Sequence, residues 1–129
     1  MNYELTISSA QIKEIAKSVE LLMRLKLGQY RELTYSLCDI FKEPTEKLDS
    51  IDAVLKTAFE IINKDKKPTD YKDDEWYILY DIYQVLRKAL HDTEHPEGQG
   101  VDSYEPLQLS TEPLPKCKWN KKRGGKSHP

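Results

Sequence analysis

Five residues around one predicted helix junction have the chemistry to bind an anion: Arg24, Lys26, Gln29, Tyr30 and Arg31. The first backbone N–H groups of a helix point outward and carry a partial positive charge, so a helix that begins near Tyr30 would attract a phosphate. Arg and Lys side chains add charge-assisted hydrogen bonds to phosphate oxygens. The alternative is that Gly28 simply ends a helix and that Gln29 is an ordinary turn residue.

Arg87, His91 and His95 recur at four-residue steps near the end of a later predicted helix. Two imidazoles at this spacing can chelate zinc. However, Pro96 disfavours helical backbone at His95, and the sequence places no third ligand, so we expect no metal site. A better functional interpretation joins Arg87 and His91 to the arginines of the helix junction in a polar pocket for a phosphorylated small molecule. The alternative is that these are ordinary surface residues, whose positive charges are favourable near a helix C-terminus.

Four aromatic residues, Trp76, Tyr77, Tyr80 and Tyr83, lie at helical spacing in the same later helix. Aromatic rings can stack on unpaired nucleobases. At this spacing they more often pack in a protein core, and this includes the core of a dimer. We therefore favour core packing.

The C-terminal end is strongly basic. The last fourteen residues contain six of the 20 basic side chains and none of the 22 acidic ones, whereas residues 1–115 carry a net charge of −8. The basic residues are Lys116, Lys118, Lys121, Lys122, Arg123 and Lys126, and Trp119 lies among them. This arm could bind nucleic-acid phosphates, lie on the acidic body of the protein or aid solubility. Because the acidic body repels a duplex, we do not expect sequence-specific DNA recognition.

No catalytic grouping is evident in the sequence. Cys38 has no base placed beside it, and no glycine-rich phosphate loop is present. Cys38 and Cys117 are expected to be free thiols. We therefore expect a protein that is not an enzyme and needs no cofactor. With neither a signal peptide nor an apolar run of roughly 18 residues in the sequence, we expect a cytoplasmic protein without membrane contact.

Apolar residues at three- and four-residue steps predict four helices that would position these side chains. The first spans residues 9–27, begins with a capping box of Ser8 and Gln11 and ends at Gly28. The second starts at about residue 30 and stops before Pro44. The third is capped by Asp49 or Ser50, and the fourth runs from about residue 73 to residue 91. Tyr3, Leu5 and Ile7 alternate with polar residues, which suggests a short N-terminal strand.

This pattern predicts an all-α fold, a small four-helix bundle with an extended, proline-rich C-terminal segment. We expect a helical domain over residues 1–92, an extended segment docked on it over 93–117 and a flexible basic tail over 118–129. The fourth helix is apolar around most of its circumference, which requires burial on more than one side. That feature suggests a homodimer or a higher homo-oligomer.

Three blocks of the chain resemble a family of small bacteriophage and prophage proteins of unassigned activity. They are residues 21–33 (LLMRLKLGQYREL), residues 80–87 (YDIYQVLR), and residues 101–104 (VDSY) with residues 110–116 (STEPLPK). The resemblance implies a phage origin and an all-helical body. The lysine-rich end, Trp119 to Pro129, departs from the family pattern.

Together these features suggest a non-enzymatic phage accessory protein in the host bacterial cytoplasm. The favoured function is counter-defence, in which the protein sequesters a nucleotide-type signal or inhibits a host defence protein. The alternative is a regulator of phage replication or transcription that contacts nucleic acid through its basic arm.

Overall fold

The computed structural model describes residues 1–66 and 72–118, and these residues form four α-helices and no strand. The all-α prediction is therefore confirmed for this part of the chain. The helices are α1 (Ser9–Lys26), α2 (Arg31–Ile40), α3 (Leu48–Asn63) and α4 (Asp74–Glu94). Two short 3-10 helices, η1 (Thr45–Lys47) and η3 (Val101–Ser103), accompany them. Each helix in the described part is too short or too polar to span a bilayer.

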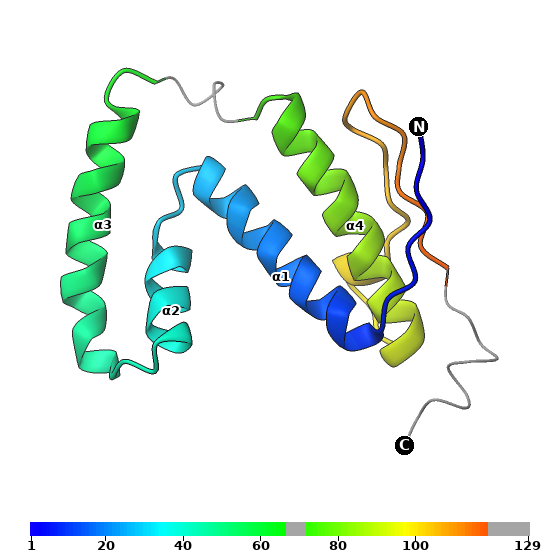
Figure 1. Cartoon of the computed structure of the whole chain (residues 1–129), viewed down its shortest axis with the longest axis horizontal. Helices are drawn as coiled ribbons and strands as arrows, with labels where there is room; N and C mark the ends of the chain where they lie inside the picture. Colours follow the sequence, from blue (N-terminus) through cyan, green and yellow to red (C-terminus); the bar gives the residue numbers. More distant parts are fainter. Residues whose placement is uncertain (67–71, 119–129) are drawn as a thin grey trace.

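The helices form two pairs (Figure 1). One pair is α1 with α4, the other is α2 with α3, and α1 and α2 also touch where the chain passes from one pair to the other. The last described segment, residues 95–118, runs beside α4. Consequently α4 is covered on one side by α1 and on another by the chain's own C-terminal segment, so its broad apolar surface is no argument for a second subunit.

The predicted signals at both ends of α1 are confirmed. Ser8 Oγ accepts a hydrogen bond from the backbone N–H of Gln11 at 3.2 Å, and Gln11 Oε1 accepts one from the N–H of Ser8 at 2.8 Å. This reciprocal pair satisfies two donors that the first helical turn leaves exposed. Past the end of the helix, Gly28 has a φ of 79°, a conformation that glycine adopts without steric cost.

Two local predictions are wrong. Residues 3–7 form no strand, because no other strand exists among the described residues to pair with them, and Tyr3 is 86% exposed. The third helix is not capped by Asp49 or Ser50. It begins at Leu48 because η1 leads directly into it through Lys47, whose backbone is already right-handed helical. Asp49 instead lies in the first turn, where its charge complements the helix dipole.

The core of the α1–α4 pair centres on Trp76. Its ring stacks on Tyr80 with centroids 5.3 Å apart, and its indole Nε1–H donates a hydrogen bond to the backbone carbonyl of Met23 at 3.1 Å. Trp76 and Met23 are both buried, as are Ala16 and Val85. Trp76 therefore packs in the core and also joins the two helices through a polar contact.

The α2–α3 pair has a smaller interface. Thr34 Oγ1 donates a hydrogen bond to Asp52 at 3.0 Å, and the rings of Tyr30 and Phe59 meet at 5.7 Å. Thr34 and Cys38 of α2 are buried, but no residue of α3 is buried. Much of the apolar surface of α3 thus faces solvent.

Replacing Trp76 by Phe is expected to lower the free energy of unfolding by about 2 kcal/mol, because it removes the bond to Met23 and leaves space in the core. Urea denaturation followed by circular dichroism measures the change. Tyr77→Phe is the control, since the Tyr77 hydroxyl makes no hydrogen bond to any residue that the structure describes, and it should shift stability by no more than about 0.5 kcal/mol. Equal effects of the two substitutions would contradict this account of the core.

Candidate ligand-binding pocket between α1 and α4

A cavity of about 590 Å³ lies between α1 and α4 and is closed on one side by residues 95–102. Its walls combine charged side chains of both signs with small and apolar ones. Helix α1 contributes Ala10, Lys13, Glu14, Ala16, Lys17 and Glu20; α4 contributes Tyr83, Arg87, Leu90, His91 and Glu94; and the following loop contributes His95, Gly98, Gln99 and Asp102.

The sequence-predicted ligand residues are divided between two places. Arg87 and His91 line the cavity, whereas the other five lie around the α1–α2 junction and do not line it. Those five are Arg24, Lys26, Gln29, Tyr30 and Arg31. The single pocket expected from the sequence is therefore not formed by direct contact of the two groups.

Acidic residues already pair with every cation of the junction. Arg24 Nε is 3.1 Å from Glu20, and Arg24 Nη1 also donates to Gln29 at 3.1 Å. Lys26 Nζ lies 3.6 Å from Asp73, and Arg31 Nε lies 3.7 Å from Asp52. An anion at the junction would have to displace these carboxylates. The same holds in the cavity, where Lys13 lies 2.9 Å from Glu94, Lys17 lies 3.2 Å from Glu14 and Arg87 lies 3.4 Å from Asp102.

Glu20 connects the junction to the cavity. One carboxylate oxygen accepts from Arg24, and the other accepts from the Tyr83 hydroxyl at 2.6 Å. The guanidinium of Arg87 lies 5.2 Å from the centre of the Tyr83 ring. Burial, with the hydrogen bond to Glu20, raises the pKa of Tyr83 to about 12, so the phenol remains a hydrogen-bond donor at neutral pH. Sequence analysis missed Glu20, although its i,i+4 spacing to Arg24 was a usable signal.

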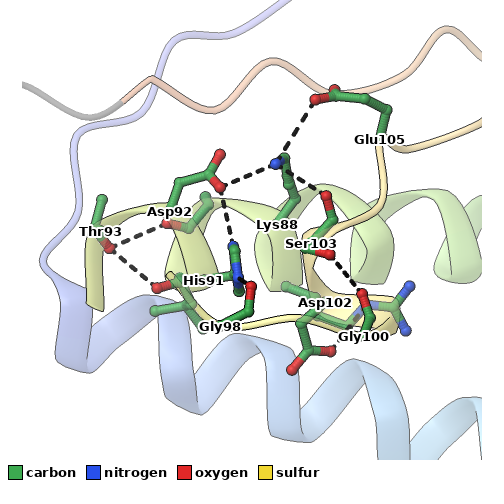
Figure 2. A network of polar contacts seen from close by, with 12 residues as sticks. Lys88, His91, Asp92, Thr93, Gly98, Gly100, Asp102, Ser103 and Glu105 are labelled. Carbon is green, nitrogen blue, oxygen red and sulfur yellow. Dashed lines mark hydrogen bonds and ion pairs between the residues drawn. The ribbon is translucent and has the colours of Figure 1, made fainter. Parts of the chain in front are cut away.

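The third wall of the cavity is held by contacts between α4 and the loop that follows it (Figure 2). Arg87 Nε lies 3.4 Å from Asp102. His91 Nε2 lies 2.8 Å from the Gly98 carbonyl oxygen, and its Nδ1 lies 3.1 Å from Asp92. Both ring nitrogens face acceptors, so only the doubly protonated imidazolium can donate to both. The bonds to Asp92 and then to Gly98 raise the pKa of His91 above its ordinary value.

Lys88 extends this network toward the C-terminal segment. Its Nζ donates to the Ser103 carbonyl at 3.1 Å and lies 3.0 Å from Asp92 and 3.7 Å from Glu105. The hydrogen bond to Asp92 is the main reason that the pKa of Lys88 is raised. The ammonium group therefore stays charged and contacts Asp92, Ser103 and Glu105, as Figure 2 shows.

One face of α4 holds the segment along most of its length. We call its five polar residues the polar ladder: Asp74, Asp81, Gln84, Lys88 and His91, which recur at steps of seven, three, four and three. Residues at such spacing lie on one face of a helix. Each of them bonds to the region between Gly98 and Thr111.

The middle of the polar ladder makes the closest backbone contacts. Gln84 Nε2 donates to the Leu107 carbonyl at 2.8 Å, and the Leu107 N–H donates back to Gln84 Oε1 at 3.0 Å. Asp81, only 2% exposed, accepts from the N–H groups of Leu109 and Ser110 at 2.9 and 3.1 Å. It also accepts from the Ser110 hydroxyl at 2.7 Å. The sequence predicted that α4 is apolar around most of its circumference and did not predict this polar face.

The remaining candidate site residues are His95 and those of the C-terminal arm. His95 ends α4 with a φ of −138°, so it has left the helix as Pro96 suggested. Within residues 1–66 and 72–118, no group of three or more His, Cys, Asp or Glu side chains is arranged to bind a metal. Lys116 and Lys118 are exposed. Trp119, Lys121, Lys122 and Arg123 lie outside the described residues.

No protein-family profile matches the chain, and no curated protein or solved structure is significantly similar to it. Its function is therefore inferred from its own residues and their geometry.

Replacing Asp81 by Ala is expected to lower the free energy of unfolding by about 3 kcal/mol, because the backbone N–H and hydroxyl of buried Ser110 and the N–H of Leu109 lose their acceptor. Urea denaturation measures the loss. Glu60→Ala removes an exposed acid on α3 and should change stability by less than about 0.5 kcal/mol. A loss for Asp81→Ala no larger than for Glu60→Ala would contradict the buried role of this carboxylate.

The stability of the protein should depend on pH through His91. Its pKa is raised in the folded state, so its stabilising contribution is complete below the unfolded pKa of about 6.5 and is lost as pH rises through the folded pKa. The urea midpoint is therefore expected to fall as pH rises above about 6.5. His91→Gln cannot titrate and should remove this slope. A slope of the same size in the variant would show that another group causes it.

Proposed function

We propose that this chain is a non-enzymatic binding protein that holds a small phosphorylated molecule of the nucleotide type in the α1–α4 cavity. The observation that supports the proposal most directly is the cavity itself, about 590 Å³ in volume and bordered by Lys13, Lys17 and Arg87. Small-molecule sites have volumes of roughly 300 to 1,000 Å³ and combine apolar walls with a few polar groups.

The charges of the cavity fit a ligand that carries both an anionic group and hydrogen-bond donors. Arg87 now pairs with Asp102, whose side chain is 59% exposed. The Arg87 side chain is 19% exposed. Because the Asp102 carboxylate is largely in solvent, it can move away at low cost, and a phosphate in its place would gain charge-assisted bonds to Arg87.

The rest of such a ligand would meet different chemistry. Glu14 and Glu20 offer carboxylate oxygens to the amino and hydroxyl groups of a base and a sugar, and Leu90 with the ring of Tyr83 offers an apolar surface. An inorganic anion has no base, sugar or apolar group to contact these side chains, and the carboxylates would repel it. The combination favours a nucleotide over a simple phosphate.

The biological setting that we propose is phage counter-defence in the bacterial cytoplasm. The resemblance of three sequence blocks to small phage proteins supports this setting. A protein that sequesters a nucleotide signal needs affinity and abundance but no catalysis, which suits a small chain.

A second candidate function is direct inhibition of a host defence protein. Ile40 and Phe41, at the end of α2, are 65% and 67% exposed. Exposed large apolar residues often mark protein interaction surfaces. This candidate predicts that the protein binds a host protein while the α1–α4 cavity remains unused.

Calorimetric titration with adenine and guanine mononucleotides and with cyclic mono- and dinucleotides tests the proposal. At least one should bind, and Arg87→Gln should weaken that binding at least tenfold by removing a charge-assisted contact. Arg31→Gln is the matched control, since Arg31 lies at the α1–α2 junction, and it should leave affinity unchanged. Absence of binding across the panel would contradict the proposal, and loss of binding only with Arg31→Gln would locate the ligand at the junction.

A further inference from the structure

The side of α3 next to its contact with α2 carries a row of apolar residues. Ile51, Val54, Ala58 and Ile61 follow one another at steps of three, four and three, so they share one face of the helix. Val54 is 69% exposed and Ile61 is 73% exposed. Ile51 and Ala58 are half-buried, and their sequence neighbours Asp52 and Phe59 contact α2. Within the described part of the chain, no residue of the row is fully buried.

An oppositely charged residue extends the row at each end. Lys47 precedes Ile51 by four residues, and Asp65 follows Ile61 by four. The backbones of Lys47 and Lys64 are right-handed helical, so the helical path continues one residue beyond each end of α3. Lys47 and Asp65 are both exposed, and the partner of Lys47 within the chain is Glu43, on the surface at 2.6 Å.

We call residues 47, 51, 54, 58, 61 and 65 the α3 row. Its steps are four, three, four, three and four, which is the same in either direction. Two copies of the row laid antiparallel would therefore meet in full register: Lys47 with Asp65, Ile51 with Ile61, and Val54 with Ala58. A parallel arrangement would set Lys47 against Lys47 and Asp65 against Asp65, which charge repulsion disfavours.

We infer that the α3 row is the contact surface of a two-fold homodimer in which α3 packs antiparallel on the α3 of a second copy. A two-fold axis makes every contact twice, so the self-complementary row supplies two ion pairs and two sets of apolar contacts. Apolar residues at alternating steps of three and four form the seam of paired helices. The small side chain of Ala58 allows the two helices to approach closely opposite Val54.

The size of the surface sets the expected strength of the dimer. A 16-residue helix such as α3 is about 24 Å long, so one helix pair buries less area than a standard stable interface. We expect a dissociation constant in the micromolar range. Because the α3 row lies on the other helix pair from the α1–α4 cavity, dimerisation does not depend on the proposed ligand.

Sedimentation equilibrium of the full chain without ligand tests the inference. The natural chain should be a dimer at about 100 µM, and Ile61→Lys should be a monomer at that concentration with an unchanged helical spectrum, since this side chain is exposed. Lys56→Glu, which alters an exposed charge of α3 outside the row, should leave the dimer intact. A natural chain that stays monomeric at about 1 mM, or a dimer that Ile61→Lys does not weaken, overturns the inference.

Charge reversal tests the antiparallel register. Lys47→Glu and Asp65→Lys should each raise the dissociation constant about tenfold, because two ion pairs become two repulsive contacts. The double variant Lys47→Glu/Asp65→Lys restores opposite charges and should return the dissociation constant to near its original value. Failure of this rescue, with the helical content preserved, would overturn the antiparallel arrangement.

Discussion

The buried carboxylate of Asp81 is the constraint on which the α1–α4 half of the structure depends. A charge with 2% exposure is stable only when hydrogen bonds replace the water that it has lost. The donors come from Leu109 and Ser110, nearly thirty residues later in the chain. The C-terminal segment must therefore lie along α4, and the other members of the polar ladder set its path.

The same constraint builds the candidate site. With the segment fixed at Asp81 and Gln84, the chain between His95 and Ser103 is held close to the end of α4, where Lys88 and His91 bond its carbonyl groups. Asp102 then pairs with Arg87 in the wall of the cavity. The second helix pair takes no part in this wall and carries the α3 row, so the proposed ligand capture and the proposed self-association would use separate halves.

Sequence patterns predicted the helices well where a short-range signal exists. The Ser8–Gln11 capping box, the positive φ of Gly28 and the start of α4 near Asp73 are each determined by residues within a few positions. The third helix start was wrong because a 3-10 turn, favoured by its continuity with α3, replaced side-chain capping. The N-terminal strand was wrong because alternation alone provides no pairing partner.

The candidate site was only partly predictable, for a physical reason. Arg87 and His91 could be found from their types and spacing, but the acids that neutralise the junction cations, Asp52 and Asp73, come from other helices. Residues so far apart in the sequence are brought together only by the tertiary fold, which short-range sequence patterns do not reveal. The polar ladder could have been recognised in the sequence as polar residues at three- and four-residue steps within an otherwise apolar helix. Polar side chains on a helix that is buried on several sides need hydrogen-bond partners, so this pattern indicates that another segment of the chain packs there.

The central claim is that α4 binds the backbone of its own C-terminal segment, and amide hydrogen exchange measured residue by residue tests it most directly. The account predicts that the N–H groups of Leu107, Leu109 and Ser110 exchange as slowly as those in the middle of α4, because each donates to a polar-ladder side chain. Exchange of these three amides at the rate of an unfolded chain, with α4 itself protected, would contradict it.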